Sequence, residues 1–309
     1  MKCILIELPT WLGDTVMTTP AIENLIRYFG EVEITLIGSS VSIEALKNHP
    51  KVINSYVIES NLITLFRSLK KLKDFDVFIS FRSSFRASFI KFCISSNIKL
   101  QYNKNLFKSG HQVERYNNFI NTSLSINSIA EELKLFNNSK KNIRKKKLLG
   151  ICPGASYGNA KRWYPKNFAD VAINLSNHYD IFIFGSNKEK DIAEDIESYL
   201  LKYGVSNYQN LVTKTNINNL IDHIANLDIL ITGDSGPMHI AAALKIPTVT
   251  IFGPTNHKET SQWMNDKSVI IRKNLDCQPC MKRVCPLKHH NCMKLVKSQE
   301  VLEAVYMLD

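Results

Sequence analysis

The sequence lacks the features of a membrane-spanning or secreted protein. None of its apolar runs approaches the roughly 20 residues that a helix needs to cross a bilayer. The first apolar run, residues 3–8, is too short for a secretory signal and is typical of a strand. With 44% hydrophobic and 22% charged residues, the 309-residue chain has the composition of a globular enzyme. We therefore expect a cytoplasmic protein.

Two further classes of protein are disfavoured by what is missing. The first strand is not followed by a G-x-G-x-x-G fingerprint, so a dinucleotide-dependent oxidoreductase is not expected. No recognised nucleic-acid-binding motif accompanies the basic residues, so nucleic acid is not an expected partner. The chain also has no sequence repeat and no low-complexity tract.

The positive charge of the chain is concentrated in its first half. The formal net charge is +11. Residues 1–147 hold 22 Lys and Arg against 12 Asp and Glu, whereas residues 148–309 hold 17 against 16. A field of this sign attracts anionic partners such as phosphorylated glycans or membrane headgroups. The alternative is a solvated basic surface that aids solubility.

Four of the seven cysteines lie close together in the sequence. They are Cys277, Cys280, Cys285 and Cys292. Their uneven spacing does not match the usual paired zinc knuckles, and an odd total without an export signal argues against a disulfide framework. We expect reduced thiols that pack a loop near the ligand, and structural zinc is the less favoured alternative.

Strands alternate with helices in both halves of the chain, which is typical of α/β proteins with a parallel sheet. We expect two doubly wound, Rossmann-like domains, 1–147 and 148–309, with a ligand cleft between them. A polar segment at 137–147 is expected to be the linker. The first half is further predicted to contain a loop over 9–15, a helix over 17–29 and helical structure over 107–138.

Asp14 lies in the loop that follows the first predicted strand, and it is the candidate general base. In an open parallel sheet, ligands bind where the carboxyl ends of the strands meet the helices. A carboxylate at this edge acts as a base if it reaches a substrate hydroxyl. The alternative is that Asp14 caps the next helix. The pattern alone favours neither interpretation.

The second half places several polar side chains at the same edge of its predicted sheet. Lys161 and Arg162 supply charge for a diphosphate, although Trp163 and Pro165 there also fit the start of a helix. Glu189 is a candidate acceptor for sugar or ribose hydroxyls, or else a first-turn acid. Asp234 and Ser235 precede a small-residue helix whose N-terminus favours an anion, but a simple helix cap explains them as well.

Two arginines end a strand of the first half. Arg82 and Arg86 lie four residues apart across a predicted helix start, with Ser84 between them. They are candidates to clamp a phosphate or carboxylate on a second substrate, and the alternative is that they are surface residues.

With these residues identified, the chain resembles the ADP-heptose:lipopolysaccharide heptosyltransferases of glycosyltransferase family 9 over essentially its whole length. The loop 277–292 is most similar to the heptosyltransferase II branch. The other matching segments are WLGDTVMTTPA at 11–21, PGA at 153–155, AKRW at 160–163, TGDSGPMH at 232–239 and FGPT at 252–255.

The resemblance implies a GT-B fold, inversion of the anomeric centre, and no metal or other cofactor. It implies that Asp14 is the base, that Lys161 binds phosphate, and that Asp234, Gly236 and His239 form a donor loop. Ser156 stands at a position where relatives differ. Taken together, the predicted donor site comprises Ser156, Lys161, Arg162, Glu189, Asp234, Ser235, Gly236 and His239, and the predicted acceptor site comprises Gly13, Arg82, Ser84 and Arg86.

The resemblance further implies that ADP-L-glycero-D-manno-heptose binds the second half and the lipopolysaccharide inner core binds the first. The expected reaction adds a heptose to the first heptose of that core, with peripheral association at the cytoplasmic face of the inner membrane. The alternatives are transfer at another core position, as in heptosyltransferases I and III, or a non-catalytic nucleotide-sugar-binding protein.

Overall fold

The computed structural model describes residues 1–58, 61–137, 139 and 144–309. The chain forms two compact units, Met1–Phe136 and Asn137–Asp309, whereas the boundary expected from the sequence follows Lys147. Of the predicted linker 137–147, residues 138 and 140–143 lie outside the described residues. Among the helices that the structure describes, none is long and apolar enough to cross a membrane.

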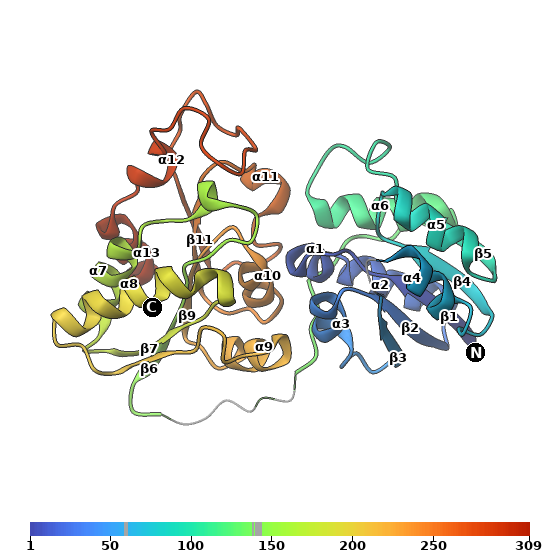
Figure 1. Ribbon diagram of the computed structural model, residues 1–309, viewed down its shortest axis with the longest axis horizontal. Coiled ribbons are helices and arrows are strands. Elements are labelled where there is room, and N and C mark those ends of the chain that lie inside the picture. The colour runs from blue at the N-terminus through green and yellow to red at the C-terminus, as the bar shows by residue number, and fades with distance from the viewer. Residues whose placement is uncertain (59–60, 138, 140–143) are drawn as a thin grey trace. The chain divides into compact units, whose positions relative to one another are not determined.

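The first unit is built on a five-stranded parallel sheet with the order β3-β2-β1-β4-β5 (Figure 1). Leu5, Ile37 and Phe78 from its central strands form a core with apolar residues of α4 and α5, so these two helices cover one face. The strands are β1 (Lys2–Glu7), β2 (Val32–Gly38), β3 (Val52–Val57), β4 (Phe75–Ser80) and β5 (Ser96–Gln101). The helices are α1 (Leu12–Met17), α2 (Thr19–Phe29), α3 (Ser40–Leu46), α4 (Leu62–Leu69), α5 (Phe85–Cys93) and α6 (Gln112–Leu124).

The second unit has a six-stranded parallel sheet with the order β11-β10-β9-β6-β7-β8. The strands are β6 (Lys147–Cys152), β7 (Tyr179–Ile183), β8 (Tyr208–Asn210), β9 (Ile229–Gly233), β10 (Thr248–Phe252) and β11 (Ser268–Arg272). The α-helices are α7 (Pro165–Leu175), α8 (Lys190–Lys202), α9 (Ile217–Ala225), α10 (Gly236–Ala243), α11 (His257–Thr260), α12 (Asn291–Lys294) and α13 (Ser298–Leu308). The 3-10 helices are η1 (Asn159–Lys161) and η2 (Asn187–Glu189).

Both sheets have the Rossmann-like strand order, so the expected α/β class is confirmed. The order reverses direction between β1 and β4 in the first unit and between β6 and β9 in the second. In such sheets, ligands bind outside the carboxyl ends of the two strands that flank this reversal. The loops after β1, β4, β6 and β9 are therefore where a site is to be sought.

The segment after β1 is helical where a loop was expected. The expected loop 9–15 and helix 17–29 are instead two helices, α1 and α2, which meet at Thr18. Because Pro20 has no N–H, it cannot donate to the Val16 carbonyl, and the Thr19 hydroxyl donates there instead at 2.8 Å. As a result, Gly13 and Asp14 lie in the first turn of a short helix rather than in a flexible loop.

The helical structure expected over 107–138 is confined to α6. This prediction was wrong for residues 125–137, because Ser125 adopts a left-handed conformation with φ 54° and ends the helix, and residue 138 lies outside the described residues. The Asn121 side chain donates to the Ser128 carbonyl at 2.8 Å, which turns the chain back. The sheet-edge strands β3, β5, β8 and β11 were not predicted, because they carry polar residues or leave many side chains exposed.

Candidate active site

Lys161 and Asp234 meet at the carboxyl edge of the second sheet. Lys161 follows β6 and Asp234 follows β9, and these two strands pair in parallel at the reversal of the strand order. Lys161 Nζ lies 2.5 Å from Asp234 Oδ2 and 3.1 Å from the Asp234 carbonyl oxygen. Thr255, which follows β10, donates its hydroxyl to Asp234 Oδ2 at 2.6 Å. Three loops are thus joined at one buried ion pair.

The N-terminus of α10 lies directly after this ion pair. Ser235 occupies the N-cap position, but its side chain makes no capping hydrogen bond and lies 3.2 Å from the Thr232 hydroxyl. The cap that the pattern alone favoured for Asp234 or Ser235 is therefore not formed by either side chain. Helix N-termini carry partial positive charge and unpaired N–H groups, so the first turn at Gly236 together with Lys161 suits an anionic ligand.

Arg162 and Glu189 form a second ion pair at the same edge. Arg162 donates to Glu189 Oε1 at 3.2 Å. Glu189 Oε2 accepts from the Ser186 N–H at 2.9 Å and from its hydroxyl at 2.6 Å, and only 5% of Glu189 is exposed. Glu189 thus has the geometry of a first-turn acid, which was one of the two alternatives left open by the sequence. A role for Glu189 in binding sugar or ribose hydroxyls stays a prediction.

Gly154 leaves the space that the Glu189 side chain occupies. A Cβ atom at position 154 would lie 1.9 Å from Glu189 Cγ. We expect Gly154→Ala to displace Glu189 and to lower the free energy of unfolding by about 2 kcal/mol, as overpacking does. Thermal unfolding of the unliganded protein checks this. Gly154→Ala in a Glu189→Ala background is the control, and the two effects should then be clearly less than additive. Strict additivity would contradict the packing argument.

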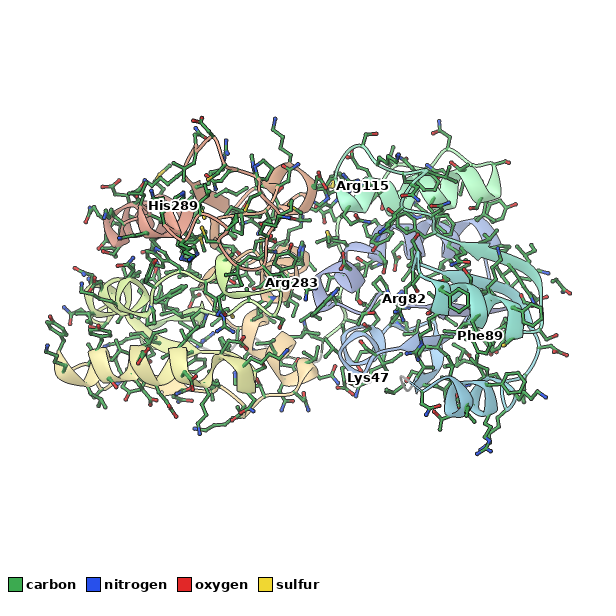
Figure 2. The ribbon with its side chains drawn as sticks, turned by 45° about the horizontal axis from the view of Figure 1, so that its top comes forward. Lys47, Arg82, Phe89, Arg115, Arg283 and His289 are labelled. Carbon is green, nitrogen blue, oxygen red and sulfur yellow. The ribbon has the colours of Figure 1, made fainter. Side chains whose placement is uncertain are left out.

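A basic loop packs against the segment that contains Lys161 and Arg162. Arg283, between β11 and α12, accepts a hydrogen bond at its carbonyl from the Ala160 N–H at 3.0 Å (Figure 2). Arg283 Cζ lies 5.5 Å and Lys161 Nζ 4.8 Å from the centre of the Tyr157 ring. The Tyr157 hydroxyl donates to the Met281 carbonyl at 2.6 Å. Two cations therefore share one aromatic ring beside the predicted donor loop.

The remaining donor-side predictions differ in their surroundings. Ser156 is exposed in the turn before η1, whereas His239 is buried on α10 with 3% of its surface exposed. These positions test neither predicted role. The four clustered cysteines are thiols, and burial together with the neighbouring thiols raises the pKa of Cys292 to about 11. Within the described ranges, no three His, Cys, Asp or Glu side chains are grouped so as to hold a metal.

Asp14 lies in the first turn of α1, just beyond the carboxyl end of β1. The N-cap of that helix is Trp11, so Asp14 is not its cap. The half-buried carboxylate is near two tyrosines of the first unit. Burial and then the charge of Asp14 raise the pKa of Tyr116. Burial also raises the pKa of Tyr102, and the charge of Asp14 acts in the same direction. The position fits a base at the ligand edge, and that role stays a prediction.

Arg82 and Arg86 are organised by a buried glutamate that the sequence did not reveal. Glu7 is fully buried at the end of β1, and burial raises the pKa of its carboxyl group. Ser80 donates its hydroxyl to Glu7 Oε2 at 2.6 Å, and Arg82 lies 3.4 Å from Glu7 Oε1. Burial and then the charge of Arg82 lower the pKa of Arg86, which places the two guanidinium groups near each other.

Ser84, predicted to bind the acceptor, has a structural partner. It is the N-cap of α5, and its hydroxyl oxygen accepts from the Ala87 N–H at 3.2 Å. The hydroxyl hydrogen remains available as a donor. The residues that sequence reasoning missed are Glu7, Tyr157, Thr255 and Arg283. Thr255 was recoverable, because it follows a predicted strand just as Asp14 and Asp234 do.

Comparison with known proteins identifies the family to which the chain belongs. The family model described as glycosyltransferase family 9 (heptosyltransferase) matches residues 62–291. Lipooligosaccharide heptosyltransferase 2 of Campylobacter jejuni subsp. jejuni serotype O:2 is 41% identical over 97% of this chain and 96% of its own length.

Solved heptosyltransferases share the fold. Escherichia coli ADP-heptose lipopolysaccharide heptosyltransferase II aligns over 100% of this chain and 98% of its own, with a TM-score of 0.80 and 23% identity. E. coli heptosyltransferase WaaC with ADP aligns over 99% of this chain and 100% of its own, with a TM-score of 0.77 and 12% identity. The likeness confirms the expected GT-B fold class. Because the family model matches most of the chain and the C. jejuni relative is 41% identical over nearly its whole length, this chain belongs to glycosyltransferase family 9, the heptosyltransferases.

Proposed function

We propose that this glycosyltransferase transfers L-glycero-D-manno-heptose from ADP-heptose to the first heptose of the lipopolysaccharide or lipooligosaccharide inner core. The observation that carries the proposal is the ammonium of Lys161 held at the N-terminus of α10, where the strand order of the second sheet reverses. A diphosphate is the anion that such a site suits. The names of the C. jejuni and E. coli relatives supply the heptose, its ADP carrier and the core acceptor.

The donor half of the mechanism follows from charge. As the bond between heptose C1 and the diphosphate oxygen breaks, the sugar gains oxocarbenium character and ADP gains negative charge. Lys161, Arg283 and the N–H groups of the first turn of α10 would meet that charge, so the proposed reaction needs no metal. Two donors of the Lys161 ammonium go to Asp234, and the third is available for a phosphate oxygen.

The acceptor half of the mechanism uses the first unit. Asp14 would remove the proton from the attacking hydroxyl as that oxygen bonds to heptose C1. Displacement of ADP from the opposite face in one step inverts the anomeric centre. Arg82 and Arg86, held beside Glu7, would bind core phosphates or Kdo carboxylates. The proposed place of action is the cytoplasmic face of the inner membrane, where such an acceptor is assembled.

Product analysis with defined acceptors tests the proposal. The purified protein is incubated with ADP-heptose and either a core that carries one heptose or a core that ends in Kdo. Mass spectrometry should show one added heptose on the first acceptor only, with no loss of rate in EDTA. Proton and carbon NMR of the product should show an inverted linkage. Addition to the Kdo-only core would instead favour a heptosyltransferase I-like reaction, and no product with either acceptor would favour a binding protein.

A further inference from the structure

A surface of the first unit exposes large aromatic side chains that the proposed reaction does not use. Phe85 and Phe92 on α5 are 84% and 83% exposed, and Ile63 on the neighbouring α4 is 64% exposed. Phe85 and Phe92 are seven residues apart, so both lie on one face of α5. Phe66, which is 38% exposed, lies three residues after Ile63 and therefore shares a face of α4 with it. We call these four exposed side chains the α4–α5 surface, and the two helices that carry them lie side by side (Figure 1).

The exposed face of α5 is distinct from the face that packs on the sheet. Ala87 and Ile90 are the buried residues of α5, and Ile90 joins the core with Leu65 and Leu69 of α4. Phe89, labelled in Figure 2, lies between the two faces and is partly buried against that core. The helix is thus already anchored without Phe85 and Phe92. Solvent-exposed aromatic side chains of this size on one helix face indicate an interaction surface.

Basic side chains border the aromatic ones. Residues 62–99 contain eight Lys and Arg against two Asp. Lys70 Nζ lies 4.6 Å from the centre of the Phe66 ring. Burial raises the pKa of the Cys93 thiol on α5, while the charges of Lys99 and Lys70 act to lower it, so both lysines lie near the end of α5. Arg67 and Lys91 carry further positive charge on the same two helices.

We propose that the α4–α5 surface docks the protein on a bilayer that contains anionic lipids. Aromatic side chains insert at the boundary between headgroups and acyl chains, and neighbouring lysines and arginines pair with anionic headgroups. A second copy of the chain is a poorer occupant, because two faces of the same high positive charge would repel each other. The aromatic and basic residues together therefore match a lipid surface in both its apolar and its charged layer.

The consequence for the reaction rests on the proposed function. Arg82 and Arg86 are the proposed acceptor-binding residues. Arg82 lies just after β4, and Arg86 lies in the first turn of α5, next to Phe85. A docked α5 would hold these arginines near the membrane plane, where phosphates and carboxylates of a lipid-linked core emerge. Docking would therefore raise the rate with a bilayer-embedded acceptor and leave the rate with a delipidated acceptor unchanged.

Vesicle sedimentation without donor or acceptor tests docking independently of the enzymatic reaction. The full chain should bind vesicles of equal parts phosphatidylcholine and phosphatidylglycerol at least about tenfold more tightly than vesicles of phosphatidylcholine alone. Phe85→Ser/Phe92→Ser and, separately, Lys70→Glu/Lys91→Glu should each weaken binding to the anionic vesicles at least about tenfold. Leu201→Ser/Tyr203→Ser on and after α8 is the matched control, because it also removes two exposed apolar side chains.

Thermal unfolding should show that all three variants fold like the parent chain, because none of the changed side chains is buried. A single Phe92→Ser variant, which is farther from Arg86, provides a second measurement if the double variant does not fold. Equal binding to both kinds of vesicle, or equal loss of binding in the Leu201 and Tyr203 control, would overturn the proposal. Concentration-dependent self-association abolished by Phe85→Ser/Phe92→Ser, without vesicle binding, would assign the surface to a second copy instead.

Discussion

Replacing Asp14 by Asn is expected to lower the rate of heptose transfer at least about a hundredfold, while the affinity for ADP-heptose stays within about threefold. Asn has nearly the shape of Asp but cannot accept the proton of the attacking hydroxyl. The short helix α1 should be preserved, because its N-cap is Trp11 and not Asp14. Donor binding should persist, because the proposed donor side chains all come from the second unit.

The Asp14 measurement combines two assays on one preparation. ADP release with donor and acceptor present reports turnover, and calorimetry with ADP-heptose alone reports binding. Glu31→Gln is a matched control, because it removes an exposed carboxylate of the same unit that pairs with Lys51 at the surface. Its rate should equal that of the parent. Near-normal turnover in Asp14→Asn would remove Asp14 from the mechanism and point to another group as the base.

The central parts of the fold could be predicted because their side chains are buried on both faces. Strands such as β1, β6, β9 and β10 are rich in apolar residues and almost entirely buried, which is the pattern of a covered parallel sheet. The edge strand β3 escaped prediction because most of its side chains are exposed and its residues are not continuously apolar. The break between α1 and α2 depends on Thr19 taking over a hydrogen bond that Pro20 cannot make, which no periodicity reveals.

The candidate site could be predicted only where one rule applied. Side chains in the segments that follow a strand, such as Asp14, Lys161 and Asp234, were found because parallel strands bring their carboxyl ends to one edge. Glu7 could not be found in this way, since it is a charged residue inside a strand and its partners, Ser80 and Arg82, are more than 70 positions away. Arg283 lies beside the proposed donor site because its loop packs on Ala160, a contact that sequence spacing does not encode.

Replacing Lys161 by Ala is expected to weaken ADP-heptose binding at least about a hundredfold and to lower turnover as well. The change removes a cation from the proposed phosphate site. It also leaves the carboxylate of Asp234, which is only 6% exposed, without its ion-pair partner. The buried, unpaired carboxylate of Asp234 should also lower the free energy of unfolding by about 3 kcal/mol. Lys166→Ala is the matched control, because its ion pair with Asp170 is a surface pair with the lysine side chain 62% exposed. Calorimetry with ADP-heptose and thermal unfolding measure the two effects.

The double variant Lys161→Ala/Asp234→Asn separates the two causes of that loss. If Lys161 only neutralised Asp234, removing both charges would restore both stability and donor binding. If Lys161 binds the diphosphate, as we propose, the double variant should regain most of the stability while donor affinity stays well below that of the parent. Part of the affinity should return, because a neutral amide at position 234 no longer repels the phosphates at the N-terminus of α10. Full recovery of donor affinity would show that the ammonium serves only the ion pair, and the charge that meets the leaving ADP would then have to come from Arg283 and the first turn of α10 alone.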